Sequence, residues 1–299
     1  MSAAQDMTAP AALGLRREAE GVASALPPLL VAAEHLAATV QMGGHGRRRA
    51  GAGEEFWQYR PAHSGDEARF VDWRRSARSD QQYIRDREWQ IAQSVHLWVD
   101  DAASMRYSGH KDRPEKGARA RLLALALAVL MIRAGERVGL VGALAPPRPG
   151  KAQLMQLAGL LSAPPGSADY GTPEVGAVVP RSRAVFISDF LGDPAPVAAA
   201  LAALADRGVR GVLLQVLDPA EEEFPFDGRT IFESMAGTLR YETRKAGDLR
   251  TRYRARLAER QAYLSHLAGT AGWQFLTHHT GAPAQGALLW LYSALEPVR

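Results

Sequence analysis

Short apolar runs alternate with helical segments from about residue 93 onwards. Apolar runs of strand length occur at 95–99, 137–143, 184–188, 211–217 and 273–277. The segments between and after them have helical patterns, at 114–134, 151–161, 196–205, 249–267 and 287–295. Strands that are apolar throughout are typical of a parallel sheet with helices on both faces. We therefore predict an α/β, Rossmann-type domain with a doubly wound, mostly parallel sheet, and residues 237–242 add a candidate edge strand.

The chain before residue 93 has a different pattern. An Ala-rich tail leads to one predicted helix, which begins after Pro28 and ends at Gly43. Residues 44–53 predict a flexible basic loop, and the residues after it are dense in Arg, Asp, Glu and Trp. We predict three parts: 1–42, a tail and helix; 43–92, an arm that packs on the sheet domain; and 93–299, the sheet domain.

Composition narrows the class of protein. The 299 residues are 46% hydrophobic, which excludes a disordered chain. There is no cysteine, so disulfides, zinc–thiolate sites, iron–sulfur clusters and a cysteine nucleophile are excluded. The longest apolar run, 122–132, is too short to cross a bilayer. With no signal-peptide pattern at the N-terminus, we expect a cytoplasmic protein without a membrane span.

Carboxylates follow three of the predicted strands. Asp100 and Asp101 come directly after the first strand, Asp189 follows the third, and Asp218 follows the fourth. Ligands of open α/β sheets bind outside the carboxyl ends of the strands, where these side chains would meet. Converging carboxylates suit Mg²⁺ or Mn²⁺. The alternative is that each Asp caps the turn or helix that follows, and Asp218, which precedes a proline, fits this alternative best.

Several catalytic motifs are missing from the sequence. It has no phosphate-binding loop, no Gly-x-Gly-x-x-Gly after a strand, no Gly-x-Ser-x-Gly and no His-Glu-x-x-His. His278 and His279 follow the last predicted strand, and adjacent residues on a strand point to opposite faces. This favours a solvated pair over a metal or base site. We predict no catalytic residue.

The arm carries a recognisable motif. Residues 51–61 read Gly-Ala-Gly-Glu-Glu-Phe-Trp-Gln-Tyr-Arg-Pro, and residues 65–78 contain Gly-Asp-Glu-Ala-Arg followed by Phe-Val-Asp-Trp-Arg-Arg-Ser-Ala-Arg. This motif closely resembles the signature of the domain-of-unknown-function 58 (DUF58) family, and the resemblance covers roughly residues 43–220. The candidate partner-binding residues within it are Asp66, Arg69, Asp72, Trp73, Arg74, Ser76 and Arg78.

The resemblance also implies a fold and a metal site. In that family the signature precedes a von Willebrand factor A-like domain, whose first strand ends in Asp-x-Ser-x-Ser-Met. Carried over, the metal ligands would be Asp100, Ser104, Thr172 and Asp189. Ala102 stands where the motif has its first serine, which replaces an oxygen ligand with a methyl group. We therefore expect a degenerate metal-ion-dependent adhesion site that binds Mg²⁺ weakly at most.

The charged residues of the arm have a structural interpretation as well. Arg–Asp pairs would clamp the arm onto the sheet domain, with Trp73 as an apolar plug, and a docking surface for another protein is compatible with this. Residues 240–260 hold eight Lys or Arg and three acids, a local balance of 8 − 3 = +5. A solvated helix face explains these basic residues better than contact with nucleic acid does, because few aromatic side chains that could stack on bases occur in this segment.

The two function hypotheses belong to different classes. The resemblance implies a non-catalytic interaction or adaptor module that works beside a MoxR-type AAA+ ATPase in chaperone-like maturation or assembly. The alternative is a Mg²⁺- or Mn²⁺-dependent nuclease or phosphoesterase, in which the strand-end carboxylates hold the metal against a phosphate. The missing catalytic motifs favour the adaptor.

Overall fold

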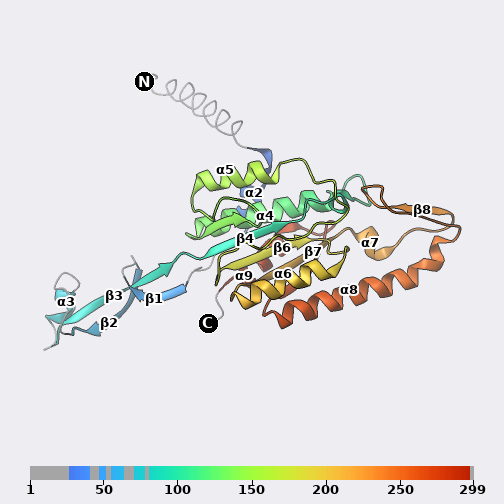
Figure 1. The fold of residues 1–299 in the computed structure, drawn as a ribbon. Coiled ribbons are helices and arrows are strands. Elements are labelled where there is room, and N and C mark those ends of the chain that lie inside the picture. Colours follow the sequence, from blue (N-terminus) through green and yellow to red (C-terminus); the bar gives the residue numbers. More distant parts are fainter. Residues whose placement is uncertain (1–26, 41–46, 52–54, 64–70, 78–80, 297–299) are drawn as a thin grey trace, which may run out of the picture. The chain divides into compact units, whose positions relative to one another are not determined.

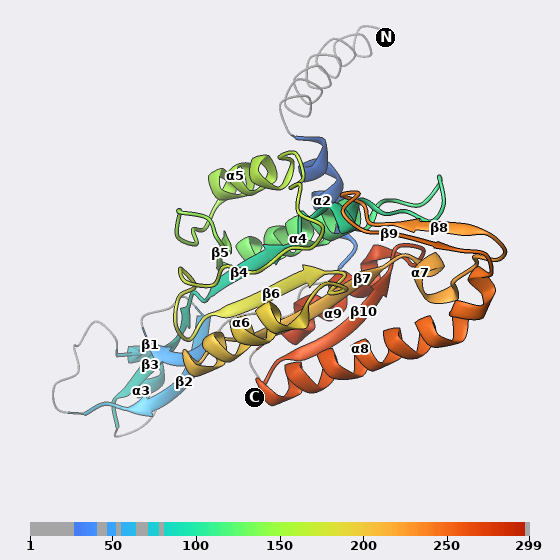
Figure 2. The ribbon, with the colours of Figure 1, turned by 45° about the vertical axis from the view of Figure 1, so that its right-hand side comes forward.

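The computed structural model describes residues 27–40, 47–51, 55–63, 71–77 and 81–296. The chain divides into two compact units, one made of residues 1–42 and 94–295 and the other of residues 43–93 and 296–299. The larger unit carries the central sheet, of which Figure 1 labels β4, β6 and β7, and Figure 2 also labels β5 and β10.

Five parallel strands form the central sheet of the larger unit, in the order β10-β7-β6-β4-β5. They are β4 (Ser94–Val99), β5 (Arg137–Leu140), β6 (Arg183–Ser188), β7 (Arg210–Leu217) and β10 (Gln274–His279). In chain order this is the 2-1-3-4-5 arrangement of a doubly wound fold, in which the first and third strands are neighbours. Figure 2 shows β4 and β6 side by side. The predicted α/β fold class is confirmed.

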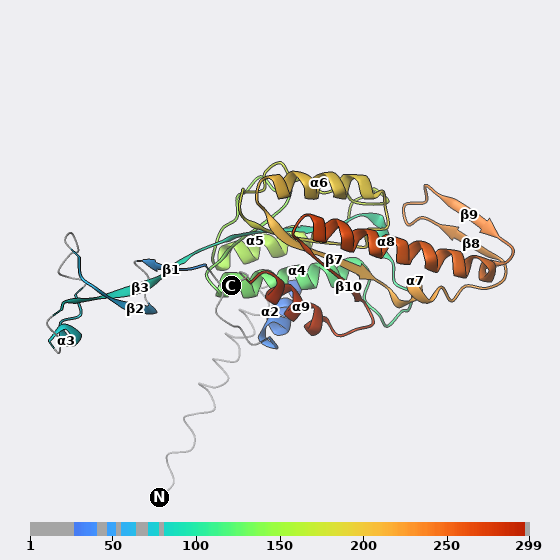
Figure 3. The ribbon, with the colours of Figure 1, turned by 90° about the horizontal axis from the view of Figure 1, so that it is seen from below.

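Successive side chains of each strand point to opposite faces of the sheet, and each face has its own apolar core. On β6, Val185 and Ile187 join one core, whereas Ala184 and Phe186 join the other. The first core is completed by α2 (Pro28–Ala38), α4 (Lys116–Arg133), α5 (Lys151–Leu161) and α9 (Ala284–Ala294). The second is completed by α6 (Pro194–Asp206) and α8 (Arg250–Thr270). Figure 3 shows these two sets of helices on opposite faces of the sheet.

Helix α4 lies at the centre of the first core. It contains the apolar run 122–132, most of which is fully buried. Helix α2 packs on α4 through Leu30, Ala33 and Ala37, which recur at the spacing of one helix face. Among the helices that the structure describes, none is long and apolar enough to span a bilayer.

Shorter elements lie in the connections between the main strands and helices of the larger unit. They are η2 (Ala103–Arg106), α7 (Pro219–Glu223), β8 (Thr230–Glu233), β9 (Arg240–Thr243) and η3 (Ala246–Leu249). The candidate edge strand 237–242 does not join the central sheet. Its residues contribute to β9, which pairs with β8 in a separate antiparallel hairpin.

The smaller unit is a three-stranded antiparallel sheet with the order β1-β3-β2. Its elements are β1 (Arg47–Gly51), β2 (Glu55–Pro61), α3 (Trp73–Ser76) and β3 (Tyr83–Ile91). The prediction of a flexible loop at 44–53 is wrong for residues 47–51, because that segment pairs with β3 along its whole length. The packing of this arm on the sheet domain stays a prediction.

Candidate functional site

The carboxyl ends of β4 and β6 meet at the point where the winding of the sheet reverses. Val99 pairs with Ile187, and the N–H of Asp100 donates to the carbonyl of Ile187 at 2.9 Å. Asp100 and Asp189 therefore leave adjacent strands at the same edge, and both are buried. Crevices at this position are the usual ligand sites of doubly wound sheets.

The Asp100 carboxylate accepts hydrogen bonds from three groups around it. Ser188 Oγ donates to Oδ2 at 2.6 Å and the Ala102 N–H donates to Oδ1 at 2.9 Å. Gly171 adds a backbone donor, and its backbone comes so close that a Cβ on Gly171 would collide with Oδ1. Burial raises the pKa of Asp100, and these hydrogen bonds oppose that rise.

The loop that brings Gly171 also covers η2. The N–H groups of Ala103 and Ser104 donate to the carbonyls of Ala168 and Asp169 at 2.8 and 3.0 Å. Ser104 Oγ is buried here, and within the described residues it has no hydrogen-bond partner. Thr172 follows Gly171 directly, but its own side chain is exposed. The structure thus brings Asp100, Ser104 and the backbone beside Thr172 together.

Asp189 is paired with a buried lysine. Lys116, the first residue of α4, is 1% exposed, and its Nζ lies 2.8 Å from Asp189 Oδ2 and 2.7 Å from Glu221 Oε1. We call Lys116, Asp189 and Glu221 the lysine cluster. Burial by itself lowers the pKa of Lys116, but the two carboxylates outweigh it, so the pKa is raised and the ammonium stays charged. Burial raises the pKa of Glu221, and Lys116 opposes that rise.

Asp218 serves as the cap of α7. Its Oδ1 accepts the N–H of Ala220 at 2.9 Å, and Glu221 completes a capping box by accepting the Asp218 N–H. Thr280 Oγ1 donates to the second carboxylate oxygen at 2.9 Å, and an Arg113 guanidinium nitrogen lies 3.4 Å from the first. The prediction that Asp218 caps the following turn is confirmed.

Three tyrosines lie near enough to the lysine cluster for its charges to act on them. Burial, followed by the negative charge of Glu221, raises the pKa of Tyr107 and of Tyr253, and burial followed by Asp189 raises the pKa of Tyr170. The Lys116 ammonium also lies 5.7 Å from the centre of the Tyr107 ring. Of the three rings, that of Tyr107 contacts the ammonium directly, so Tyr107 helps to cover the buried lysine.

These residues do not fit a divalent cation held between Asp100 and Asp189. Both oxygens of Asp189 are used, one by Lys116 and the other by the N–H of Leu191 at 3.0 Å. Both oxygens of Asp100 are used as well. In the part of the chain that the structure describes, no three His, Asp or Glu side chains converge as metal ligands. The chain's own ammonium supplies the positive charge at this edge.

Residues 58–263 match the protein family described as "Protein of unknown function DUF58". The chain belongs to the DUF58 family. The match begins in β2 of the smaller unit and continues into α8 of the larger unit. No curated protein is significantly similar to the chain.

Several solved structures share a distant likeness with this DUF58 chain. One is an aerotolerance-related membrane protein from Bacteroides fragilis NCTC 9343 with multiple mutations to serines, at 17% identity and a TM-score of 0.41, covering 68% of this chain and 98% of that one. Another is the conserved hypothetical protein BatB from Bacteroides thetaiotaomicron, at 16% identity and a TM-score of 0.39, covering 68% and 98%. A third is an uncharacterized membrane spanning protein from Vibrio fischeri, at 13% identity and a TM-score of 0.20, covering 69% and 99%. Such distant similarity adds nothing to the site described above.

The DUF58 signature residues shape the smaller unit. Asp72 caps α3 by accepting the N–H of Arg75 at 3.0 Å. Ser76 Oγ links the helix to β3, because it donates to the Asp72 carbonyl at 2.8 Å and accepts the Tyr83 N–H at 2.9 Å. Asp72 and Ser76 therefore hold the local fold together.

Trp73 is 58% exposed, so its own unit does not bury it. The prediction that Trp73 plugs the arm onto the sheet domain stays a prediction. Arg74 is exposed beside it. The remaining signature candidates, Asp66, Arg69 and Arg78, lie outside the described residues.

Lys116 and Glu221 are the main residues that sequence reasoning about this DUF58 chain missed. One signal was available for the lysine. A helix N-terminus carries partial positive charge, so a lysine at the start of a mostly apolar helix is unfavourable unless anions lie close by.

The prediction of solvated histidines also fails at His278, which is buried and accepts a hydrogen bond from Arg119 at 2.9 Å. Burial, followed by Arg119, lowers the pKa of His278 to about 4.

Proposed function

We propose that this DUF58 protein is a non-catalytic protein-interaction module that acts with a MoxR-type AAA+ ATPase in chaperone-like maturation or assembly in the cytoplasm. Membership of the family supports the partner class. The order of the parallel strands supports a von Willebrand factor A-like domain, whose adhesion site is degenerate here. The observation that carries the proposal is the lysine cluster at the sheet edge.

The contacts of the strand-end carboxylates argue against a metal-dependent hydrolase. Such an enzyme holds its metal with carboxylates that keep free oxygens, and it aims a base at water or substrate. Asp189 is neutralised by Lys116, Asp100 accepts from Ser188 and Ala102, and Asp218 caps a helix. An edge organised in this way favours rigid presentation of a surface over bond cleavage.

Affinity purification of the full chain from its native host tests the proposal. We expect an AAA+ ATPase among the recovered proteins, both with Mg²⁺ and with a chelator. The variant Trp73→Ala should reduce its recovery, since exposed tryptophans are common interface anchors. Tyr263→Ala is the matched control, because Tyr263 is an exposed aromatic of α8 in the other unit.

An enzymatic outcome would contradict the proposal. The decisive assay incubates the full chain with single-stranded DNA, double-stranded DNA or a chromogenic phosphodiester in the presence of Mn²⁺. Cleavage that disappears in Asp100→Asn would establish a metal-dependent nuclease or phosphoesterase. Loss of ATPase recovery in Trp73→Ala, with an unchanged circular dichroism spectrum and no cleavage, would support the interaction module.

A further inference from the structure

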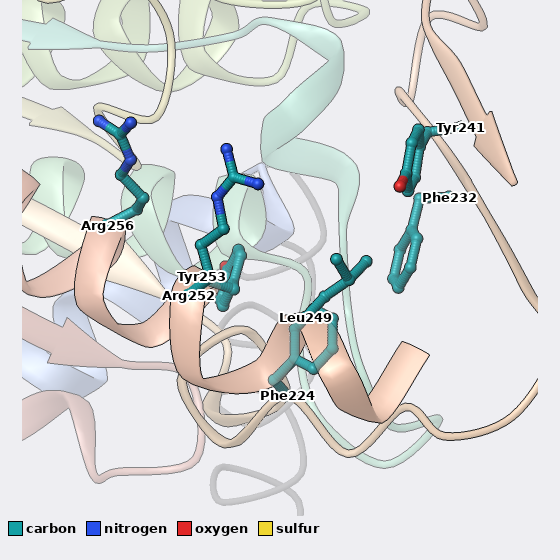
Figure 4. Close-up of a pocket in the computed structure, with 7 residues that line it drawn as sticks. All are labelled: Phe224, Phe232, Tyr241, Leu249, Arg252, Tyr253 and Arg256. Atoms are coloured by element: carbon teal, nitrogen blue, oxygen red, sulfur yellow. The ribbon is translucent and has the colours of Figure 1, made fainter. Parts of the chain in front are cut away.

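A cavity of about 550 Å³ lies between the β8–β9 hairpin and the start of α8. We call it the hairpin groove, and Figure 4 shows the side chains around it. Its lining residues are Phe224, Phe232, Tyr241, Leu249, Arg252, Tyr253 and Arg256. Aromatic and aliphatic side chains make up most of this wall, two arginines complete it, and no carboxylate is among the described residues that line it. The volume falls within the range of small-ligand and side-chain pockets.

The floor of the hairpin groove is a packed aromatic cluster. The Phe224 ring is buried, and its centre lies 4.9 Å from that of Tyr253 and 5.6 Å from that of Phe232. The ring of Phe226 also packs against those of Phe224 and Phe232, with ring centres 5.2 and 5.3 Å apart. Arg250 fastens the same segment by donating to the carbonyl of Phe224 at 3.0 Å. The floor is therefore formed in advance of any ligand.

The hairpin wall is fixed at its tip. The Asp169 carboxylate accepts the N–H of Ala236 at 2.9 Å and the hydroxyl of Ser234 at 3.1 Å, and the Thr238 hydroxyl also donates to it. On the wall, Tyr241 pairs with Phe232 across the strands, yet it is 57% exposed. Because a carboxylate from another loop holds this wall, the hairpin is ordered before a ligand binds, and binding does not have to include the free-energy cost of ordering it.

Exposed apolar side chains extend the surface beyond the hairpin groove. Leu239 and Met235, near the tip of the same hairpin, are both exposed, as is Tyr241. Exposed apolar side chains that are grouped on one element typically mark an interaction site. Exposed apolar side chains on the hairpin both inside and outside the groove favour an extended polypeptide segment over a single small molecule as the ligand.

The charge on the rim is positive. Figure 4 shows Arg252 and Arg256 extending in the same direction from α8. Within the described residues, Arg252 forms no ion pair or hydrogen bond, and Arg256 has only an exposed pair with Glu259 at 3.6 Å. Exposed pairs of this kind stabilise a protein by about 1 kcal/mol at most, so both guanidinium groups remain open to a carboxylate.

We propose that the hairpin groove docks an acidic, extended segment of a partner protein. A large apolar or aromatic side chain of that segment rests on Phe224, Phe232 and Tyr241, and flanking carboxylates pair with Arg252 and Arg256. This inference rests on the proposed interaction function and names the surface that performs it. A concave floor favours an inserted side chain over a lipid bilayer, which presents a nearly flat surface.

Fluorescence anisotropy on the full chain tests the groove with three labelled ten-residue peptides. The first consists of Asp and Glu around one central phenylalanine, the second has alanine in place of the phenylalanine, and the third has Gln and Asn in place of the acids. We expect only the first to bind well, with affinity that falls as salt is raised. Tyr241→Ala should weaken its binding about tenfold or more, as is usual for an interface anchor. Arg252→Glu should weaken it as well, whereas Arg254→Glu, which changes an exposed arginine of α8 outside the groove, should not.

Several results would overturn the inference. Equal binding of the three peptides, or equal effects of Arg252→Glu and Arg254→Glu, would show that only net charge matters. Sedimentation with phosphatidylglycerol vesicles that is lost in Tyr241→Ala, without peptide binding, would assign the surface to a membrane. Light scattering that reveals a dimer broken by Tyr241→Ala would assign it to a second copy of the chain.

The same variants separate this inference from the proposed function. If an AAA+ ATPase is recovered equally by the wild type and by Tyr241→Ala, and the first peptide does not bind, the interaction module stands and the hairpin groove is not its docking site. If the peptide binds as expected but no ATPase is recovered, the groove stands and the proposed partner is wrong.

Discussion

Replacing Lys116 with methionine removes the ammonium between Asp189 and Glu221 while keeping an unbranched side chain of similar length. Lys116 and Asp189 are each 1% exposed, so water cannot take over the role of the ammonium. Breaking a buried ion pair by removing one partner costs about 3–5 kcal/mol. Glu221 keeps its capping box and is more accessible, so most of the loss comes from Asp189. We expect the lower half of that range.

Urea unfolding followed by circular dichroism measures this loss. In a thermal unfolding experiment, a loss of about 3 kcal/mol in a domain of this size corresponds to a fall in Tm of roughly 6–12 °C. Lys151→Met is the matched control, because Lys151 also begins a helix but is exposed, and its free energy of unfolding should change by less than about 0.5 kcal/mol. Adding Asp189→Asn to Lys116→Met should restore part of the lost stability, since the unpaired charge is then gone.

The pH dependence gives a second readout with a definite sign. Without the ammonium, the effect of burial, which raises the pKa of Glu221, is no longer opposed by Lys116, so lowering the pH favours the folded form of the variant. The deficit of Lys116→Met against the wild type should therefore be smaller at about pH 5 than at about pH 8. A deficit that matches Lys151→Met, or one that grows on acidification, would refute the charge balance inferred for the lysine cluster.

Three further outcomes follow from the same edge and its surroundings. Gly171→Ala should lower the free energy of unfolding by about 1–3 kcal/mol, because its Cβ would meet the Asp100 carboxylate, whereas Gly176→Ala, with open space around it, should be nearly neutral. Burial, followed by Arg207, lowers the pKa of His96 to about 4. The stability that comes from keeping His96 neutral is therefore fully present above about pH 6.5 and is lost as the pH falls from about 6.5 to about 4. Over that interval His96→Gln should reduce the slope of unfolding free energy against pH by up to about 1.4 kcal/mol per unit; an unchanged slope would contradict the shift. Addition of about 10 mM Mg²⁺ should raise the wild-type Tm by less than about 1 °C, and a rise of several degrees would show that the strand-end carboxylates do bind the metal.

Most of the sheet domain could be predicted from the sequence because its strands are buried on both faces. Such strands are apolar throughout, and the helices between them have their own periodicity, so each element is visible by itself. The antiparallel strands of the smaller unit, such as β1, carry arginines and pair over long intervals of sequence. Their stability comes from cross-strand partners, and no local pattern reveals those partners.

The candidate site was predictable in position but not in chemistry. The strand-end rule places Asp100 and Asp189 at one edge, because parallel strands bring their carboxyl ends together. Lys116 arrives from the start of α4 and Glu221 from α7, at separations of 73 and 105 residues between the members of each pair. Which helix turn faces the edge depends on the packing of the whole layer, so neither residue could be assigned from its neighbours in sequence.

An internal ammonium and a bound metal make different demands on a partner. A metal at the strand ends can accept a carboxylate from another protein, and a chelator abolishes that contact. The Lys116 ammonium is buried, already has two carboxylates, and cannot be removed by a chelator. If the protein is the interaction module proposed above, recognition uses surfaces outside the strand ends, such as the exposed Trp73 of the smaller unit or the hairpin groove of the larger one. Partner recovery that is equal with Mg²⁺ and with a chelator agrees with this reasoning, and recovery that requires Mg²⁺ would return the binding role to Asp100 and its neighbours.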